Sequence, residues 1–392
     1  MHEIVISGAA RTAMGGLQGT FCNLSASDMG GPAIRAAMKG AGVKSVDEVI
    51  MGCVLPAGQG QAPARQAVFS AGLSHHVPAT TVNKMCGSGM KAVMMASDQI
   101  ALGYTETAVA GGMESMTNSP YLLPKMRSGA RIGHQKVVDH MFLDGLEDAY
   151  DQGRLMGSFA EECAEAYQFT RQAQDEYALS SLTRAREAQE KGLFKIEIAA
   201  VDVPSRSGTT SVVDDEQLAL ARPEKIPHLK SAFRENGTVT AANSSSISDG
   251  AAALVLARAS VARSRYLPIR AKIVGYCSHA QAPSTFTTAP VPAVQKLLDR
   301  IGWSKESIDL WEVNEAFAVV PLAFMQEMSL DIESVNIHGG ACALGHPIGA
   351  SGARIIVTLL NALEQHALRR GVAAICIGGG EATAIAIERD VS

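Results

Sequence analysis

Three residues of this sequence combine a reactive side chain with a glycine-rich setting, namely Cys86, His346 and Cys376. Thiol and imidazole groups are suited to nucleophilic and acid–base chemistry near neutral pH. Cys86 follows the β-branched run 80–82 and precedes the apolar run 92–95. This pattern predicts a strand, a tight turn and a helix N-terminus, with the thiol at the turn, as in a nucleophile elbow.

Gly87 and Gly89 surround this turn on its helix side, and we expect them to let the backbone turn sharply and let another group approach closely. The first N–H groups and the dipole of the helix would then stabilise a thiolate at Cys86. The same residues also fit a buried cysteine that only happens to precede a helix, because free cysteines are among the most buried residues.

His346 lies in a second glycine-rich turn, residues 339–352, where Pro347 fixes the local backbone. It is either a structural histidine or the partner of Cys86 in a thiolate–imidazolium couple. Cys376 closes a predicted strand and is followed by three glycines. Alone it would be a core residue, but facing a first cysteine and a histidine it is a candidate general base with a pKa tuned toward neutral.

Two further positions could stabilise charge. Asn314 closes one predicted strand and opens a helix, so its amide could orient a water or a carbonyl oxygen, or cap the helix. The backbone N–H groups of Cys86 and Gly378, one at each glycine-rich turn, are suited to hold a developing oxyanion.

An internal duplication can bring these distant residues together. Ser88-Gly89 before a helix, then a strand ending in residues 110–114, matches Ser351-Gly352 before a helix, then a strand ending in 377–381. Two equivalent halves would pack as a pseudo-twofold pair and bring their turns to a shared face. Strands that alternate with helices also predict an α/β fold with a mostly parallel sheet covered on both faces.

The pattern assigns elements along the whole chain. Helices are predicted at 25–39, 64–71, 88–102, 158–167, 170–191, 291–301, 316–328 and 353–368, with Ser25 and Thr170 as N-caps. Strands are predicted at 3–7, 46–53, 107–110, 252–257, 271–276, 308–313, 335–337, 373–377 and 384–388.

The chain divides into three parts that differ in polarity and charge. Residues 1–117 form the first α/β half, to which 248–268 return, and residues 269–392 form the second. Between them, 118–247 are more polar, and their segments 127–134 and 203–227 read as loops. Such an excursion usually lies over an active site.

Bulk properties exclude several classes of protein. The chain has 392 residues, 47% hydrophobic and 19% charged, with a net charge of −5 and no basic stripe for nucleic acid. Its seven scattered cysteines, without a CxxC pair, indicate neither a disulfide framework nor a metal site. No signal peptide, long apolar span or C-terminal address is visible, so we expect a cytoplasmic protein. No Walker loop or nicotinamide fingerprint stands out.

Several motifs, in order, show that the chain resembles the thiolase family over essentially its whole length. They are Asn83-Lys84-Met85-Cys86-Gly87-Ser88-Gly89, Gly111-Gly112-Met113-Glu114-Ser115-Met116, Asn314-Glu315-Ala316-Phe317, Gly345-His346-Pro347-Ile348-Gly349 and Cys376-Ile377-Gly378-Gly379-Gly380.

The resemblance implies a duplicated, five-layered α-β-α-β-α core with an inserted loop domain that binds coenzyme A. It implies ping-pong acyl transfer, either condensation of two acetyl-CoA molecules or thiolysis of 3-ketoacyl-CoA, with CoA as substrate and no permanently bound cofactor. Cys86 would carry the acyl group, activated by His346, while Cys376 would exchange the α-proton. Asn314, through a water, and His346 would hold the enolate oxygen, and the N–H groups of Cys86 and Gly378 the acyl carbonyl. By motif, CoA would contact Met156, Phe233, Ala241, Ser245, Ile247 and Phe317. Homodimers or homotetramers are typical of the family.

The sequence departs from the family pattern at three positions. Leu155 replaces a histidine beside the pantetheine site, Phe286 alters the expected acyl pocket, and Glu381 replaces a residue of the C-terminal glycine motif. A broad-chain degradative thiolase of fatty-acid β-oxidation therefore stays open as an alternative. A decarboxylating ketosynthase would replace the second cysteine with histidine chemistry, and an inactive lipid-binding relative would have lost Cys86, His346 or Cys376.

Overall fold

The computed structural model of the chain describes residues 2–205 and 208–390. Residues 1, 206–207 and 391–392, which belong to the three parts predicted from the sequence, lie outside the described residues. Its strands are β1 (Ile4–Thr12), β2 (Gly15–Gly16), β3 (Glu48–Gly52), β4 (Ala79–Val82), β5 (Thr107–Ser115), β6 (Tyr121–Leu122), β7 (Val138–Asp139), β8 (Ile198–Ala199), β9 (Val201–Ser205), β10 (Gly208–Val212), β11 (Ser248–Arg258), β12 (Ala271–Ala280), β13 (Leu310–Val313), β14 (Arg370–Ile377) and β15 (Glu381–Glu388). Its α-helices are α1 (Ala26–Ala41), α2 (Pro63–Ser70), α3 (Ser88–Leu102), α4 (Met156–Ala166), α5 (Arg171–Glu190), α6 (Glu216–Leu220), α7 (Ala259–Ser264), α8 (Pro290–Ile301), α9 (Val319–Met328), α10 (Ala341–Leu344) and α11 (Ile348–Gln365).

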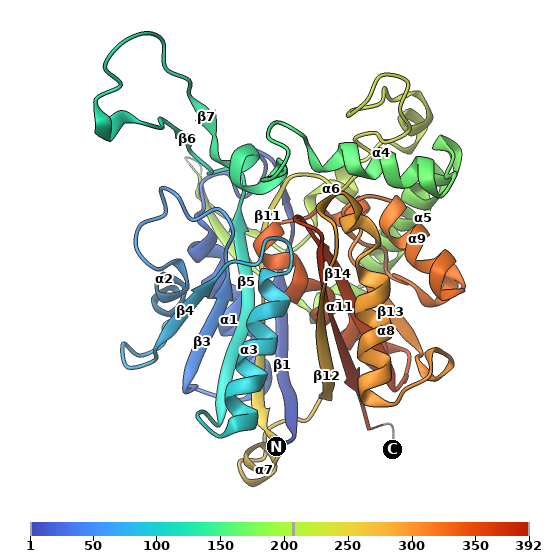
Figure 1. The fold of residues 1–392 in the computed structure, drawn as a ribbon. Helices are drawn as coiled ribbons and strands as arrows, with labels where there is room; N and C mark the ends of the chain where they lie inside the picture. Colours follow the sequence, from blue (N-terminus) through green and yellow to red (C-terminus); the bar gives the residue numbers. More distant parts are fainter. Residues whose placement is uncertain (1, 206–207, 391–392) are drawn as a thin grey trace.

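The order of the strands displays the duplication (Figure 1). The main path through the sheet runs β13-β14-β15-β12-β1-β11-β5-β3-β4. From the junction of β12 and β1, the two directions give the equivalent orders β12-β15-β14-β13 and β1-β11-β5-β3. β5, which contains the first glycine–glutamate repeat, and β14, which the second repeat directly follows, therefore occupy matching places in the two halves.

The expectation of a mostly parallel sheet is wrong. β3 runs parallel to β4 and β5, and β13 parallel to β14, but β1, β11, β12 and β15 pair antiparallel with their neighbours on the main path. The physical reason is that some consecutive strands are joined by connections too short for a parallel arrangement. A loop of three glycines, Gly378–Gly380, joins β14 to β15, and so short a link can only return the chain antiparallel.

Helices complete a five-layered α-β-α-β-α core. α1 packs on β1 and β11, and α8 packs on β12 and β15, so each covers one outer face. α3 and α11 pack against each other between the halves, and α11 contacts strands of both. Every residue from Ile348 to Leu363 of α11 is buried, as expected of a helix enclosed on all sides. None of the described helices is long and apolar enough to cross a lipid bilayer.

Some local predictions are confirmed and others are wrong. Ser25 forms a capping box with Asp28, and Thr170 accepts a hydrogen bond from an N–H of the first turn of α5. α11 begins five residues earlier than expected, because its small residues pack tightly rather than form loop. The strand expected at 335–337 is absent; Val335 makes one isolated bridge. The expected loop 203–227 contains the β9–β10 hairpin and α6.

The excursion covers the end of the core where the glycine-rich turns lie (Figure 1). It consists of a projecting arm with β6 and β7, then α4, α5 and the segments that lead into β11. A buried ion cluster fastens it to the core, in which Arg11 of β1 contacts Glu197 at 2.6 Å and Asp215 at 2.7 Å. Since these charges are buried and mutually paired, removal of one partner would leave an uncompensated charge.

Candidate active site

A cavity of about 380 Å³ lies between the excursion and the glycine-rich turns. All the predicted site residues except Asn314 line it, and they come from both halves and from the excursion. They are Cys86, Met156, Phe233, Ala241, Ser245, Ile247, Phe317, His346, Cys376 and Gly378. Leu155 and Phe286, the two departures near the expected ligand, line it too.

The turn at Cys86 gets its shape from Met85. This residue has a left-handed φ of 48°, while Gly87 has an ordinary φ of −83°. The hydroxyl of Ser88 accepts a hydrogen bond from the N–H of Lys84 at 2.8 Å and donates to the carbonyl of Met85 at 2.6 Å, which holds the strained turn. The expectation that the glycines make the turn is therefore wrong.

The glycines at this turn instead allow close packing. A Cβ on Gly87 would lie 2.4 Å from Ile377, the residue before Gly378, and a Cβ on Gly89 would lie 2.8 Å from the backbone of Ala353 in α11. At Gly89 the neighbour is backbone, so glycine is required there for the two halves to approach each other; at Gly87 a side chain would force the end of Ile377 to move.

Two N–H groups converge on the thiol of Cys86. Its own N–H and that of Gly378 lie near enough to the sulfur to lower its pKa. Burial has the larger effect, and it raises the pKa of Cys86 to about 11. The net shift therefore favours the thiol over the thiolate, while the two backbone N–H groups act in the predicted direction, toward the thiolate.

His346 is held as a neutral base. Its Nδ1 lies 2.6 Å from the hydroxyl oxygen of Ser351, and that hydroxyl donates its own proton to the carbonyl of Pro347 at 2.9 Å. The hydrogen-bond network thus assigns the proton to Nδ1 and leaves a lone pair on Nε2, which is buried and has no partner among the described residues. Burial, and then the charge of Arg354, lower the pKa of His346 to about 3.

Cys376 is a protonated thiol. It is 1% exposed at the end of β14, and burial, with the neighbouring Cys86, raises its pKa well above the usual range. The expectation of a thiol tuned toward neutral is wrong, since the packing of the two halves removes this residue from water. A neutral thiol beside a nucleophile is suited to donate a proton.

Asn314 lies just after β13, fully buried and outside the lining of the cavity. Neither its side-chain nitrogen nor its oxygen has a partner among the described residues. It does not cap α9, which begins at Val319 after Ala318. Next to it, the Glu315 carboxylate accepts hydrogen bonds from Tyr177, Ser181, Asn336 and the N–H of Cys342, which fixes this turn. A buried amide with two unpaired atoms is suited to hold a water or a ligand atom.

Aromatic rings form the apolar side of the cavity. Phe317 makes edge contacts with Phe233 and Phe286, with ring centroids 5.9 and 6.5 Å apart. Phe286 is 3% exposed and also contacts Phe159 at 6.3 Å. Phe286 therefore fills space beside the reactive groups and limits the size of what binds there.

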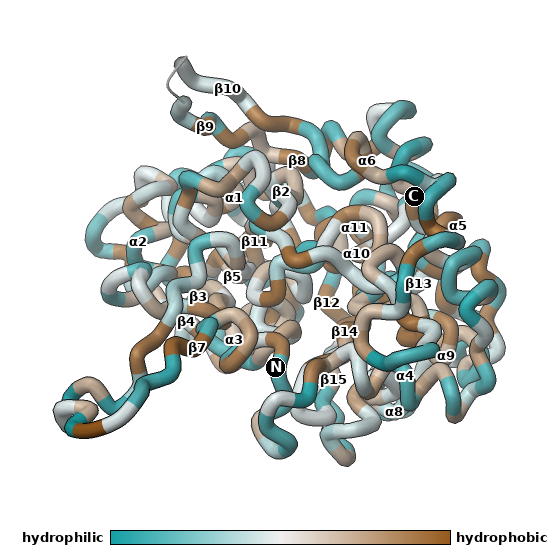
Figure 2. The backbone as a smooth tube through the Cα atoms, turned by 90° about the horizontal axis from the view of Figure 1, so that it is seen from above, coloured by the Kyte–Doolittle hydropathy of each residue, from teal (hydrophilic) through white to brown (hydrophobic). Residues whose placement is uncertain are grey.

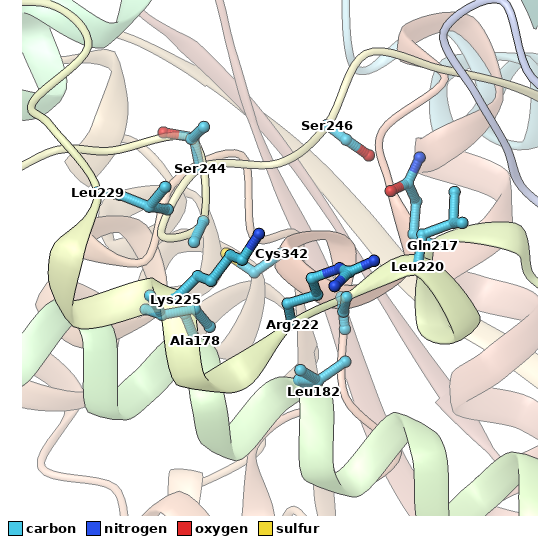
Figure 3. A pocket seen from close by; sticks show the side chains of 15 residues that line it. Ala178, Leu182, Gln217, Leu220, Arg222, Lys225, Leu229, Ser244, Ser246 and Cys342 are labelled. Carbon is cyan, nitrogen blue, oxygen red and sulfur yellow. The ribbon is translucent and has the colours of Figure 1, made fainter.

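A second cavity of about 280 Å³ adjoins the first and shares Ala241, Ser244 and Ser246 with it. Figure 3 shows Arg222 and Lys225 among the residues that line it. Sequence reasoning missed both cations, because they lie in the segment read as loop; the signal for them was two basic residues around a proline, with no predicted partner.

No group of three or more His, Cys, Asp or Glu side chains among residues 2–205 and 208–390 is arranged to hold a metal ion. The arrangement therefore offers a thiol, a neutral imidazole, a second thiol and converging N–H donors. Together these groups can form and break a covalent bond between sulfur and a carbonyl carbon.

Comparison with known proteins agrees with this arrangement. Residues 4–260 match the family model described as the thiolase N-terminal domain, and residues 267–389 match the thiolase C-terminal domain. The chain is 48% identical to acetyl-CoA acetyltransferase 2 of Arabidopsis thaliana, covering 99% of this chain and 97% of the relative. It is 46% identical to acetyl-CoA acetyltransferase of Cupriavidus necator, covering 99% and 100%. The crystal structure of the Bacillus anthracis acetyl-CoA acetyltransferase superposes with a TM-score of 0.96 at 40% identity, covering 99% of each chain.

Proposed function

This chain belongs to the thiolase family and is an acyltransferase, and from that premise we propose that it interconverts two acetyl-CoA molecules with acetoacetyl-CoA and free CoA. The observation that carries the proposal is one cavity that contains Cys86, His346, Cys376 and Gly378. CoA enters as a substrate, not as a resident cofactor.

In the first half of thiolysis, His346 Nε2 takes the proton of the Cys86 thiol, and the sulfur attacks the 3-keto carbon. The N–H groups of Cys86 and Gly378 stabilise the oxyanion that forms. The bond between C2 and C3 then breaks, and its electron pair passes to the thioester as an enolate. The Cys376 thiol protonates C2, and acetyl-CoA leaves.

During that step, the enolate oxygen is held by His346, which is now protonated, and by Asn314 acting through a bound water. The unpaired atoms of the Asn314 amide support this role. In the second half, CoA gives its thiol proton to the Cys376 thiolate and attacks the acyl-enzyme carbonyl. The Cys86 sulfur leaves and regains its proton from His346. Condensation is the reverse sequence, in which Cys376 as thiolate takes the α-proton.

We infer that CoA spans both cavities. Met156, Phe233, Ala241, Ser245, Ile247 and Phe317 would contact its pantetheine arm, and the residues shared by the two cavities support one continuous ligand. Arg222 and Lys225 would then face its phosphates, because cations are the natural partners of phosphate oxygens. This extends the predicted CoA contacts by two residues.

The domains proposed from the sequence are consistent with these roles. Residues 1–117 and 248–268 carry Cys86, residues 269–392 carry His346 and Cys376, and residues 118–247 would cover CoA.

We also propose that the protein is cytoplasmic and forms a homotetramer. The projecting arm supports assembly: it exposes large apolar residues, with Tyr121 69% and Ile132 92% exposed, and Figure 2 shows it extending away from the body. Light scattering of the purified protein measures the mass of the assembly.

The test of the function is CoA-dependent thiolysis over a chain-length series, from acetoacetyl-CoA to a long 3-ketoacyl-CoA. Because Phe286 fills the cavity, we expect kcat/KM to fall sharply beyond four carbons. Equal or rising values with longer chains would favour the alternative, a broad degradative thiolase. No turnover of any member would contradict the proposal altogether.

A further inference from the structure

Lys84 and Glu381 form a salt bridge between the two halves of the protein. Lys84 lies two residues before Cys86, and Glu381 is the first residue of β15, directly after the Gly378–Gly380 loop. Their side chains are only 21% and 35% exposed. The two turns that supply the converging N–H donors are therefore joined by one pair of opposite charges.

The glycine loop needs such an anchor. Gly379 and Gly380 have φ values of 91° and 86°, and three glycines in succession have more backbone freedom than any other sequence. Two contacts help to fix the loop. The N–H of Gln281 donates to the carbonyl of Gly380 at 2.7 Å, and Ile377, just before the loop, packs on Gly87. The ion pair adds a polar contact to the opposite turn.

On the other side, Lys84 is rigidly joined to the nucleophile. Its N–H donates to the Ser88 hydroxyl, and its carbonyl accepts the N–H of Gly87 at 3.1 Å. Cys86 is thus enclosed by hydrogen bonds that begin at Lys84. The backbone of Lys84 is therefore part of the turn that carries Cys86.

The duplication supplies a counterpart. Glu114 ends the matching repeat in the first half, and its carboxylate accepts N–H groups of Val54 and Gly349, each at 2.9 Å. Gly349 lies in the first turn of α11, three residues after His346. Each half therefore sends the glutamate at its repeated position to the catalytic turn of the other half.

We propose that Lys84 and Glu381 are positioning residues, whose ion pair holds the N–H groups of Cys86 and Gly378 at the spacing that binds the oxyanion. This inference rests on the proposed function. Removal of one charge should keep the thiol and both N–H donors in the site but change the spacing of the donors. Acyl transfer should then slow, without weaker binding of CoA.

The experiment measures the pre-steady-state rate of acylation from acetoacetyl-CoA and the KM for CoA in Lys84→Met, Glu381→Met and the charge-exchanged double variant Lys84→Glu/Glu381→Lys. We expect each single variant to acylate about tenfold more slowly, less than the loss of a whole oxyanion donor, with KM unchanged. The exchanged pair should recover most of the rate. Lys272→Met is the matched control, because Lys272 also pairs across the halves, with Glu3 at 3.3 Å, but far from the site.

Three results would overturn the proposal: single variants that acylate at the parent rate, a rise in KM for CoA at unchanged acylation rate, or an exchanged pair as slow as the single variants. The second would mean that Lys84 binds substrate directly. If the parent protein itself forms no acyl-enzyme, the proposed function has failed, and that outcome is distinct from all three.

Discussion

The Nδ1 atom of His346 lies 2.6 Å from the hydroxyl oxygen of Ser351, one turn into the helix that His346 precedes. Because the hydroxyl proton is committed to the carbonyl of Pro347, this contact fixes which imidazole nitrogen carries hydrogen. The free lone pair then belongs to Nε2, the atom that in the proposed mechanism accepts the proton of Cys86. Ser351, to which the sequence analysis assigned no catalytic role, thus sets the tautomer of His346.

Ser351→Ala should therefore lower kcat for thiolysis by about tenfold to a hundredfold, because the imidazole loses the bond that orients it. Stopped-flow acylation from acetoacetyl-CoA measures the effect. Ser97→Ala is the matched control, since Ser97 is a buried helix serine that donates to the carbonyl four residues earlier at 2.8 Å, away from the site. Equal losses in both variants would show that Ser351 matters only for the helix.

The lowered pKa of His346 predicts a loss of stability in acid. Below the ordinary histidine pKa of about 6.5 the unfolded chain binds a proton that the folded chain refuses until about pH 3, so the free energy of unfolding falls as pH falls through this window. Urea unfolding at pH 6.5 and pH 5 should show that His346→Asn loses about 1.6 kcal/mol less than the parent. Identical losses would contradict the low pKa.

Cys376→Ser should separate acylation from proton exchange. The alcohol is a far weaker acid than the thiol, so Cys86 should still be acylated from a simple acyl-CoA while the α-protons of acetyl-CoA stop exchanging. Deuterium uptake into acetyl-CoA, followed by NMR, measures the exchange. Undiminished exchange in this variant would remove Cys376 from the role.

Sequence reasoning singled out three residues that the structure brings into one cavity, but it did not predict their resting state. Glycine context and internal repetition indicated Cys86, His346 and Cys376, because short-range patterns shape turns. The raised pKa values of the two thiols were not predicted, since they depend on burial created when residues almost 300 positions apart pack together. The antiparallel pairing of β11 and β15 escaped prediction for the same reason, as strand direction depends on long-range packing.

Phe286→Ala should widen the range of accepted chains. Loss of the ring opens space beside Phe317, and each methylene that enters it adds about 0.8 kcal/mol of burial. The ratio of kcat/KM for a six-carbon 3-ketoacyl-CoA to that for acetoacetyl-CoA should rise severalfold. Phe324→Ala, a buried phenylalanine of the same cluster that does not line the cavity, controls for lost stability. An unchanged ratio would show that the acyl chain lies elsewhere.

The double variant Arg222→Ala/Lys225→Ala should raise KM for CoA about tenfold or more, because two phosphate contacts are lost. Thiolysis with pantetheine, which lacks the nucleotide, should be unaffected. Lys39→Ala/Lys44→Ala removes the same charge from an exposed part of the first half and serves as the control. A matching rise in KM for pantetheine would contradict phosphate recognition by this pair.

In the proposed mechanism, Cys86 carries the acyl group. Brief incubation with acetyl-CoA, acid quenching, digestion and mass spectrometry locates the adduct directly. The proposed mechanism predicts one acetyl group on Cys86 in the parent protein, its removal on addition of CoA, and no adduct in Cys86→Ser. An acetyl group on Cys376 instead, or an equal adduct in Cys86→Ser, would contradict it.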